Sequence, residues 1–134
     1  MNTLATLQQR IDPLFPGAMG IKPSEVSRDR VVASMEVRSD LCTSGNVLHG
    51  GAIMAFADTL GAVATIANLP EGARTTTIES KTNFLGAIPV GTHVQGECTP
   101  FHRGKTTMVW QTLVRSEAGK LCAVVTQTQM VLAA

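Results

Sequence analysis

The spacing of hydrophobic residues changes along the first third of the chain. Within residues 3–15 the apolar positions recur every three or four residues, which predicts a short amphipathic helix closed by Pro13. These positions are Leu4, Leu7, Ile11 and Leu14. From 21 to 37 the spacing falls to two on either side of a polar turn, so this segment is expected to form a β-hairpin. The polar residues 39–46 are predicted to form a loop.

A long apolar run follows at 51–69, directly after His49 and Gly50, and it is expected to form a helix. At the helical period the bulky residues share one side: Ile53, Phe56, Leu60 and Val63. Small residues and one acid lie roughly opposite: Gly51, Ala55, Asp58, Ala62 and Thr65. The bulky side is expected to pack on a sheet, whereas the small side leaves room for a second backbone or a ligand. Asp58 lies on the side that has room.

The same run is nearly long enough to cross a membrane. A charge near the centre of a lone transmembrane helix costs ~3 kcal/mol on insertion scales, and the rest of the chain is typical of strands without a second span. A helix wrapped by protein is therefore favoured over a membrane span. No membrane partner is expected.

The second half of the chain contains four strand-like runs, at 75–85, 92–101, 106–115 and 121–132. Short, turn-like connections join them, so the pairing is expected to be mostly antiparallel, as in a meander. With the hairpin, these runs predict an α+β fold. A curled antiparallel sheet of about six strands would wrap one long central helix, with a short helix at the N-terminus.

Composition narrows the class of protein. A chain of 134 residues with 44% hydrophobic content fits a single domain over 1–134. A net charge of +1, 16% charged residues and no tyrosine argue against nucleic-acid binding. The three cysteines and three histidines are scattered, so neither a disulfide framework nor a metal site is expected. Arg10, Asp12 and Pro13 interrupt any secretory signal, which predicts a cytoplasmic protein.

Two features of the apolar helix carry candidate chemistry. Asp58 is either a catalytic carboxylate or a buried acid satisfied by hydroxyls and backbone donors. The sequence His49-Gly50-Gly51 is either a tight turn or a place where a ligand oxygen reaches unpaired N–H groups at the positive end of the helix dipole. An oxyanion could bind at such a helix start. The combination favours a functional site.

The residues that carry these features also resemble a known family. LHGGAIMAFADTLGAVA at 48–64, ECTPFHRGKTTMVWQ at 97–111 and GKLCAVVTQTQMVL at 119–132 are similar to segments of hot-dog-fold acyl-CoA thioesterases. The resemblance is to the phenylacetate-pathway, 4-hydroxybenzoyl-CoA and 1,4-dihydroxy-2-naphthoyl-CoA type, and it covers nearly the whole chain. The shared signature is an LHGG turn followed, eight residues after its first glycine, by a helix Asp or Glu.

The resemblance implies hydrolysis of an acyl-CoA thioester, with an aromatic acyl group favoured. The Gly50 N–H would bind the thioester carbonyl, and Asp58 would act as nucleophile or as general base on water. His49 would orient the turn or the thioester, or be purely structural. Thr59 would position Asp58 or water, or bond back into the helix. Coenzyme A would enter as part of the substrate, with no further cofactor.

Other residues are expected to bind the rest of the substrate. Gly51 would offer close backbone approach, and three side chains would line an acyl pocket or else belong to the core: Met54, Ala62 and Phe84. The turn at 103–105 would bind the CoA phosphates or be a solvated hairpin tip; it contains Arg103, Gly104 and Lys105.

The chain departs from the family pattern at three positions. Asp58 stands where close relatives often have Glu, and Gly86 stands where some carry a basic residue. Thr43 replaces a common Gln or Asn seven residues before Gly50, which puts a side-chain amide contact in doubt. Asn46 is close enough in sequence to substitute for it.

Two other functions are compatible with the same fold. A hot-dog hydratase or dehydratase would act on the same thioesters, generally with a catalytic His and an acid. A non-catalytic acyl-CoA-binding module would hold the thioester without consuming it. The spacing of the acid after the HGG turn favours the thioesterase.

Helix geometry further predicts that the site is shared between two chains. Eight residues at 1.5 Å rise separate Gly50 from Asp58 by ~12 Å, whereas attack on a carbonyl needs ~3 Å. Two antiparallel copies of the helix about a twofold axis would bring each Gly50 near the Asp58 of the other chain. The family resemblance implies the same homodimer, commonly paired into a tetramer as a dimer of dimers.

Overall fold

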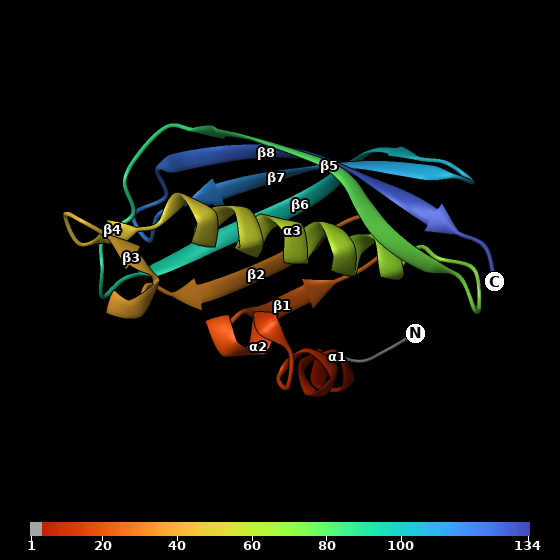
Figure 1. Ribbon diagram of the computed structural model, residues 1–134, viewed down its shortest axis with the longest axis horizontal. Coiled ribbons are helices and arrows are strands. Elements are labelled where there is room, and N and C mark those ends of the chain that lie inside the picture. Colours follow the sequence, from red (N-terminus) through yellow and green to blue (C-terminus); the bar gives the residue numbers. More distant parts are fainter. Residues whose placement is uncertain (1–3) are drawn as a thin grey trace.

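Six antiparallel strands curl around one long helix in the computed structural model, which describes residues 4–134 (Figure 1). This is the predicted α+β layout. The helices are α1 (Leu4–Ile11), α2 (Phe15–Met19) and the central α3 (Gly50–Ile66). The strands are β1 (Lys22–Val26), β2 (Val31–Glu36), β3 (Cys42–Thr43), β4 (Val47–Leu48), β5 (Arg74–Phe84), β6 (His93–Arg103), β7 (Thr107–Arg115) and β8 (Leu121–Leu132). Among these residues, no helix is both long and apolar enough to span a bilayer.

The order of the strands corrects one prediction. The large sheet runs β1-β2-β6-β7-β8-β5, with all pairs antiparallel, so only β6, β7 and β8 form the expected meander. Strand β5 pairs with β8 at the edge of the sheet and not with β6. The connection 86–91 is as short as a hairpin loop, but it crosses the end of the molecule. Its backbone bonds to β4 and to the end of β2, where Leu48 donates to Ile88 and Gly91 donates to Val37.

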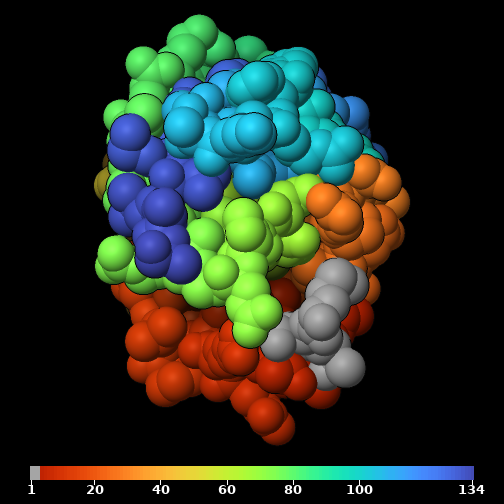
Figure 2. All heavy atoms as spheres, turned by 90° about the vertical axis from the view of Figure 1, so that its right-hand side faces the viewer, coloured from red at the N-terminus to blue at the C-terminus, as the bar shows by residue number. Residues whose placement is uncertain are grey.

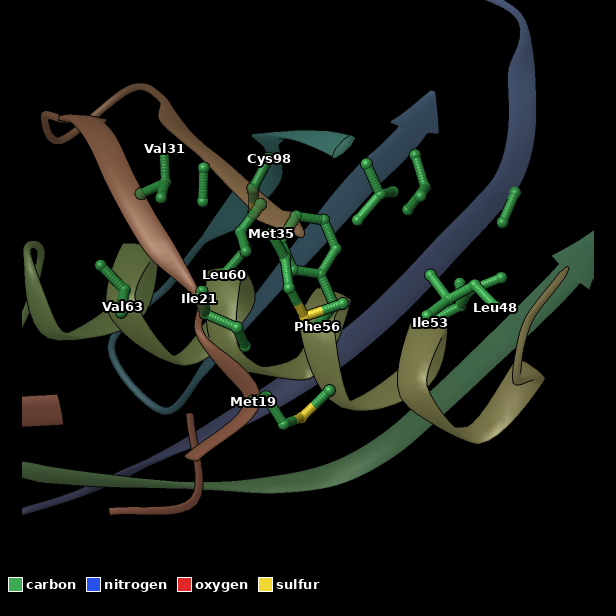
Figure 3. Packing of buried hydrophobic residues seen from close by; sticks show 14 of the residues in the cluster. Met19, Ile21, Val31, Met35, Leu48, Ile53, Phe56, Leu60, Val63 and Cys98 are labelled. Carbon is green, nitrogen blue, oxygen red and sulfur yellow. The ribbon is translucent and has the colours of Figure 1, made fainter. Parts of the chain in front are cut away.

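The bulky side of α3 forms the core, as predicted. Its four large residues are buried against the sheet, with Met35 and Cys98 beside them (Figure 3). Strand β6 approaches the helix closely because it has a glycine at 96. A Cβ on Gly96 would lie 2.7 Å from the Phe56 ring and 2.8 Å from Leu60.

The placement of Thr65 on the open side of α3 was wrong. Thr65 is fully buried, and its Oγ1 accepts the indole N–H of Trp110 from β7 at 2.9 Å. The sheet curls far enough to cover a second side of the helix as well as the bulky one. A helical wheel assumes one flat packing surface and therefore misplaces a residue on this flank.

The N-terminal half contains four more elements than predicted: the helix α2, a short 3₁₀ turn and the strands β3 and β4. Pro13 does end α1, but the chain forms the short helix α2 directly afterwards. Thr3, the first residue of the predicted helix, lies outside the described residues. The segment 39–46 is a short 3₁₀ turn followed by the β3–β4 hairpin and not a plain loop. Gly45 and Asn46 close that hairpin in the left-handed region, at φ of 87° and 59°.

Candidate active site

Helix α3 begins at Gly50, and the side chain of His49 caps its first turn. The His49 Nδ1 accepts the Gly51 N–H at 2.8 Å. The His49 carbonyl accepts the N–H groups of Ala52 and Ile53. Within residues 4–134, the Gly50 N–H has no acceptor. It is therefore the first-turn donor that is left for a ligand oxygen, at the positive end of the helix dipole.

The cap defines what His49 and Gly51 do in the folded chain. Because Nδ1 accepts a hydrogen bond it carries no proton, and the imidazole N–H of neutral His49 is at Nε2. His49 thus orients the turn, while a contact with the thioester stays a prediction. The Gly51 N–H already donates to His49 Nδ1, so it is not available to bind substrate in this arrangement.

Four of the predicted site residues form one line along α3. Gly50, Met54, Asp58 and Ala62 are each four residues apart, and residues at this spacing lie on one face of a helix. Met54 is exposed, and the others are half-buried. We call these four residues the open line. Phe84, at the end of β5, borders it, because a Cβ on Gly50 would lie 3.2 Å from the Phe84 ring.

Asp58 is held from the side of the sheet by residues that the sequence prediction missed. Its Oδ1 accepts the Thr77 hydroxyl of β5 at 2.9 Å and the Gln127 amide of β8 at 3.3 Å. The Oδ2 atom has no hydrogen-bond partner within residues 4–134. The carboxylate is therefore fixed through one oxygen, and the other remains for chemistry.

A third missed residue completes this support. Gln129 Oε1 lies in hydrogen-bonding contact with Thr77 Oγ1 and accepts from Gln127 Nε2 at 3.0 Å. We call Thr77, Gln127 and Gln129 the Asp58 support. The sequence does carry a signal for its two glutamines, because they continue the inward-facing positions Ala123 and Val125 of β8. Alternate Thr residues at 126 and 128 hide that signal by making both faces polar.

The remaining predicted substrate-binding residues are not gathered at Asp58. Thr59 donates its hydroxyl to the Ala55 carbonyl at 2.8 Å, which is the structural alternative expected for it. Thr43 and Asn46 lie on the exposed β3–β4 hairpin, and neither side chain bonds to another described residue. Beside Gly86, the Lys120 side chain fills the space. A Cβ on Gly86 would lie 3.2 Å from Lys120 Nζ.

The turn between β6 and β7 lies at the other end of α3 from Gly50. Figure 2 faces this end and shows the turn beside the segment after α3 and the β1–β2 turn. A cavity of about 690 Å³ opens there, lined by Arg28, Asp29, Asn68, Pro70, Arg103, Gly104, Lys105, Met108 and Val131. Arg103 donates to Asp29 Oδ1 at 2.7 Å and to the Arg28 carbonyl at 2.8 Å. Lys105 has no ion pair within residues 4–134.

The comparisons with known proteins agree with this fold. Residues 45–123 match the family model described as the thioesterase superfamily. A thioesterase from Haemophilus influenzae has a structure that matches 98% of this chain and 92% of its own at a TM-score of 0.93, with 31% identity. The proofreading thioesterase EntH of Klebsiella pneumoniae is 30% identical over 90% of this chain and 87% of its own.

A third relative is named by its substrate. The 1,4-dihydroxy-2-naphthoyl-CoA hydrolase of Escherichia coli is 29% identical over 90% of this chain and 88% of its own. The matched region runs from the β3–β4 hairpin through α3 and into β8, so it includes Gly50 and Asp58. Family, fold and catalytic class agree: the chain belongs to the thioesterase superfamily and is a hot-dog-fold thioester hydrolase.

Proposed function

We propose that this protein hydrolyses an acyl-CoA thioester to a free acid and coenzyme A, with Asp58 as its catalytic carboxylate. The observation that carries the proposal is the arrangement on α3. Within residues 4–134, Asp58 is fixed through Oδ1 and has no partner at Oδ2, and it lies on the same open line as the Gly50 N–H, which has no acceptor there.

The two groups divide the chemistry between them. The Gly50 N–H would bind the thioester oxygen and stabilise the negative charge that develops on it. Asp58 Oδ2 would either take a proton from a water that attacks the carbonyl carbon or attack that carbon itself. In the first route the C–O bond from water forms as the C–S bond breaks, and the proton taken by Asp58 passes to the coenzyme A sulfur. In the second route the C–S bond breaks as an Asp58 anhydride forms, and one water then cleaves that anhydride and supplies the proton of the thiol. Each route consumes one water.

The distance along α3 requires a second chain in this mechanism. Gly50 and Asp58 are ~12 Å apart at the helical rise of 1.5 Å per residue, so one carbonyl cannot contact both within one chain. Within residues 4–134, Asp58 also lines none of the three most prominent surface cavities of the single chain. We infer a homodimer in which the open lines of two α3 helices run antiparallel. Pairing of two such dimers would give the expected tetramer.

An aromatic acyl group is the substrate that the comparisons support best. The E. coli relative that matches 90% of this chain is named for a naphthoyl thioester. Met54 on the open line and Phe84 beside it are exposed apolar side chains, as a pocket wall for a flat ring requires. For the coenzyme A end, the cations Arg103 and Lys105 border the cavity beyond the C-terminus of α3.

The test is thiol release from a panel of aryl-, short-chain and long-chain acyl-CoA thioesters, with Asp58→Asn beside the wild type. The amide has the size of the carboxylate but neither attacks nor takes a proton. Turnover should therefore fall by a factor of a thousand or more, which corresponds to a loss of ~4 kcal/mol in transition-state stabilisation. Asp12→Asn is the matched control, because Asp12 is an exposed aspartate bonded to Gln8. It should keep the wild-type kcat.

Three outcomes would contradict the proposal. Wild-type turnover by Asp58→Asn would remove Asp58 from the chemistry. Conversion of crotonyl-CoA without thiol release would favour a hydratase. Tight binding of every thioester without turnover would favour the acyl-CoA-binding module.

A further inference from the structure

The inner face of β8 carries two glutamines where a core strand normally carries aliphatic residues. Its inward positions run Ala123, Val125, Gln127 and Gln129, and each glutamine is only 1% exposed. Burying a polar amide with any of its groups unpaired costs ~1–3 kcal/mol. Gln127 Oε1 is buried and has no partner within residues 4–134. The strand therefore holds a destabilising group at this position.

The fold makes space for Gln127 at a specific place on α3. A Cβ on Gly61 would lie 2.2 Å from Gln127 Cδ and 2.4 Å from its Nε2, so any larger residue at 61 would displace the amide. In the space left by Gly61, Gln127 Nε2 reaches Asp58 twice. It lies 3.3 Å from Oδ1 and 3.4 Å from the backbone carbonyl.

Gln129 fixes the amide of Gln127 and the hydroxyl of Thr77 together. Gln127 Nε2 has two hydrogens, one for Gln129 Oε1 at 3.0 Å and one for Asp58. Gln129 Nε2 donates to Thr75 Oγ1 at 3.0 Å, and Thr75 donates onward to the Met130 carbonyl. Since Thr75 must accept from Gln129, the oxygen of the Gln129 amide faces Gln127 and Thr77.

The Thr77 hydroxyl has a single hydrogen and two acceptors, Asp58 Oδ1 and Gln129 Oε1. With Asp58 ionised, the hydrogen points to the carboxylate. In this state Asp58 Oδ1 accepts from both Thr77 and Gln127, and Oδ2 is left for the substrate.

We propose that Gln127 and Gln129 are positioning residues that hold Asp58 Oδ1 so that Oδ2 faces the thioester, at a cost in stability. This inference rests on the proposed function of Asp58. Apolar core residues of equal size could not perform this role, because Gln127 hydrogen-bonds to Asp58 and Gln129 hydrogen-bonds to Gln127.

The test replaces both glutamines by methionine, which has a similar length and no polar group to bury. In Gln127→Met/Gln129→Met, Thr77 still donates to Asp58 and Thr75 still donates to Met130. The double variant should therefore melt at or above the wild-type Tm. It should also lose at least tenfold in kcat, with KM within twofold. A pair that served the fold alone would give the reverse, a lower Tm with unchanged kcat.

The matched control is Gln111→Met, which makes the same chemical change on β7, where Gln111 pairs with Thr126 and has no contact with Asp58. It should leave kcat unchanged. In the Asp58→Asn background the two methionines should cause no further loss of rate. A wild-type kcat in the double methionine variant, with Asp58→Asn inactive, would overturn this inference alone. An active Asp58→Asn would overturn the proposed function first.

Discussion

The two proposed catalytic groups on α3 are held in opposite ways. At the start of the helix, the Gly50 backbone N–H is available because no group within residues 4–134 accepts its hydrogen bond. The exposed side chain of His49 caps the turn from outside. In the middle of the helix, Asp58 offers a side-chain oxygen, and its other oxygen is fixed from inside by the half-buried Thr77 of β5 and the buried Gln127 of β8. The Gly50 N–H depends on open space around it, whereas the Asp58 carboxylate depends on the packing of the residues behind it.

The difference shows how one helix can serve two purposes. The buried side of α3 faces the sheet and contributes to stability, while the open line faces outward and is proposed to determine the rate. Asp58 lies at the boundary, with Oδ1 on the buried side and Oδ2 on the open side. Changes on the two sides should therefore have separable effects on stability and on rate.

After the loss of Asp58, the largest effect is expected from filling the space at Gly50. Gly50→Ala places a methyl group 3.2 Å from the Phe84 ring, at the point where the thioester carbonyl must approach the N–H. Loss of one oxyanion donor costs ~3 kcal/mol, or about a hundredfold in kcat. Steady-state kinetics with the best acyl-CoA of the panel would measure it.

A matched variant separates the two consequences of that methyl group. Gly50→Ala/Phe84→Leu removes the crowded ring but keeps the methyl group in the path of the carbonyl. The loss of kcat should persist in this variant. If kcat returns to the wild-type value, the methyl group acts by moving Phe84 and not by obstructing the N–H.

The second prediction tests whether the two groups work across a dimer. Asp58→Asn and Gly50→Ala chains, each nearly inactive alone, should regain activity when they are unfolded and refolded together. A mixed dimer pairs an intact Gly50 from one chain with an intact Asp58 from the other, which gives one working site of two. Random assembly makes half the dimers mixed, so about a quarter of the wild-type activity is expected. Mixed dimers that are folded but inactive would place each site within one chain.

The sequence was sufficient to predict most of this fold because periodicity reports burial. The bulky side of α3, the first hairpin and the last three strands all follow from it. The position of β5 did not follow, because the six residues at 86–91 have the same length whether they close a hairpin or cross the sheet. The spacing of apolar residues within a strand does not indicate which distant strand it pairs with.

The candidate site was predictable only where it lies on one element. Gly50 and Asp58 belong to a single helix, and a spacing of eight residues places them on one face. The Asp58 support comes from two further strands, and its members are hidden in polar runs. Thr77 is one of three consecutive threonines, and Gln127 lies between threonines, so neither face of its strand is marked as inward by sequence alone.

The third prediction contrasts the two sides of α3 directly. Gly96→Ala on β6 would force a methyl group to 2.7 Å from Phe56, and such overpacking costs ~1–3 kcal/mol of stability. Its kcat per folded molecule should stay unchanged.

Met54→Ala on the open line should leave the free energy of unfolding within ~0.5 kcal/mol of the wild type. It should instead change the order of preference among acyl groups. Denaturant unfolding and the thioester panel measure both, and a rate loss in Gly96→Ala would show that the two sides are coupled.

The smallest effect is expected at the far end of α3, where the cavity at the β6–β7 turn would bind the nucleotide of coenzyme A. Replacing Arg103 and Lys105 by Ala should raise KM for acyl-CoA about tenfold, the equivalent of ~1.4 kcal/mol, with little change in kcat. A thioester of the same acid that lacks the nucleotide should not show the increase.

Arg103 also bonds Asp29, so Asp29→Ala reports what loss of that ion pair does by itself. Arg10→Ala/Lys22→Ala removes the same charge on α1 and β1, and it controls for net charge alone. Equal increases for both substrates would remove nucleotide binding from this turn and leave Arg103 as a tie between the β6–β7 and β1–β2 turns.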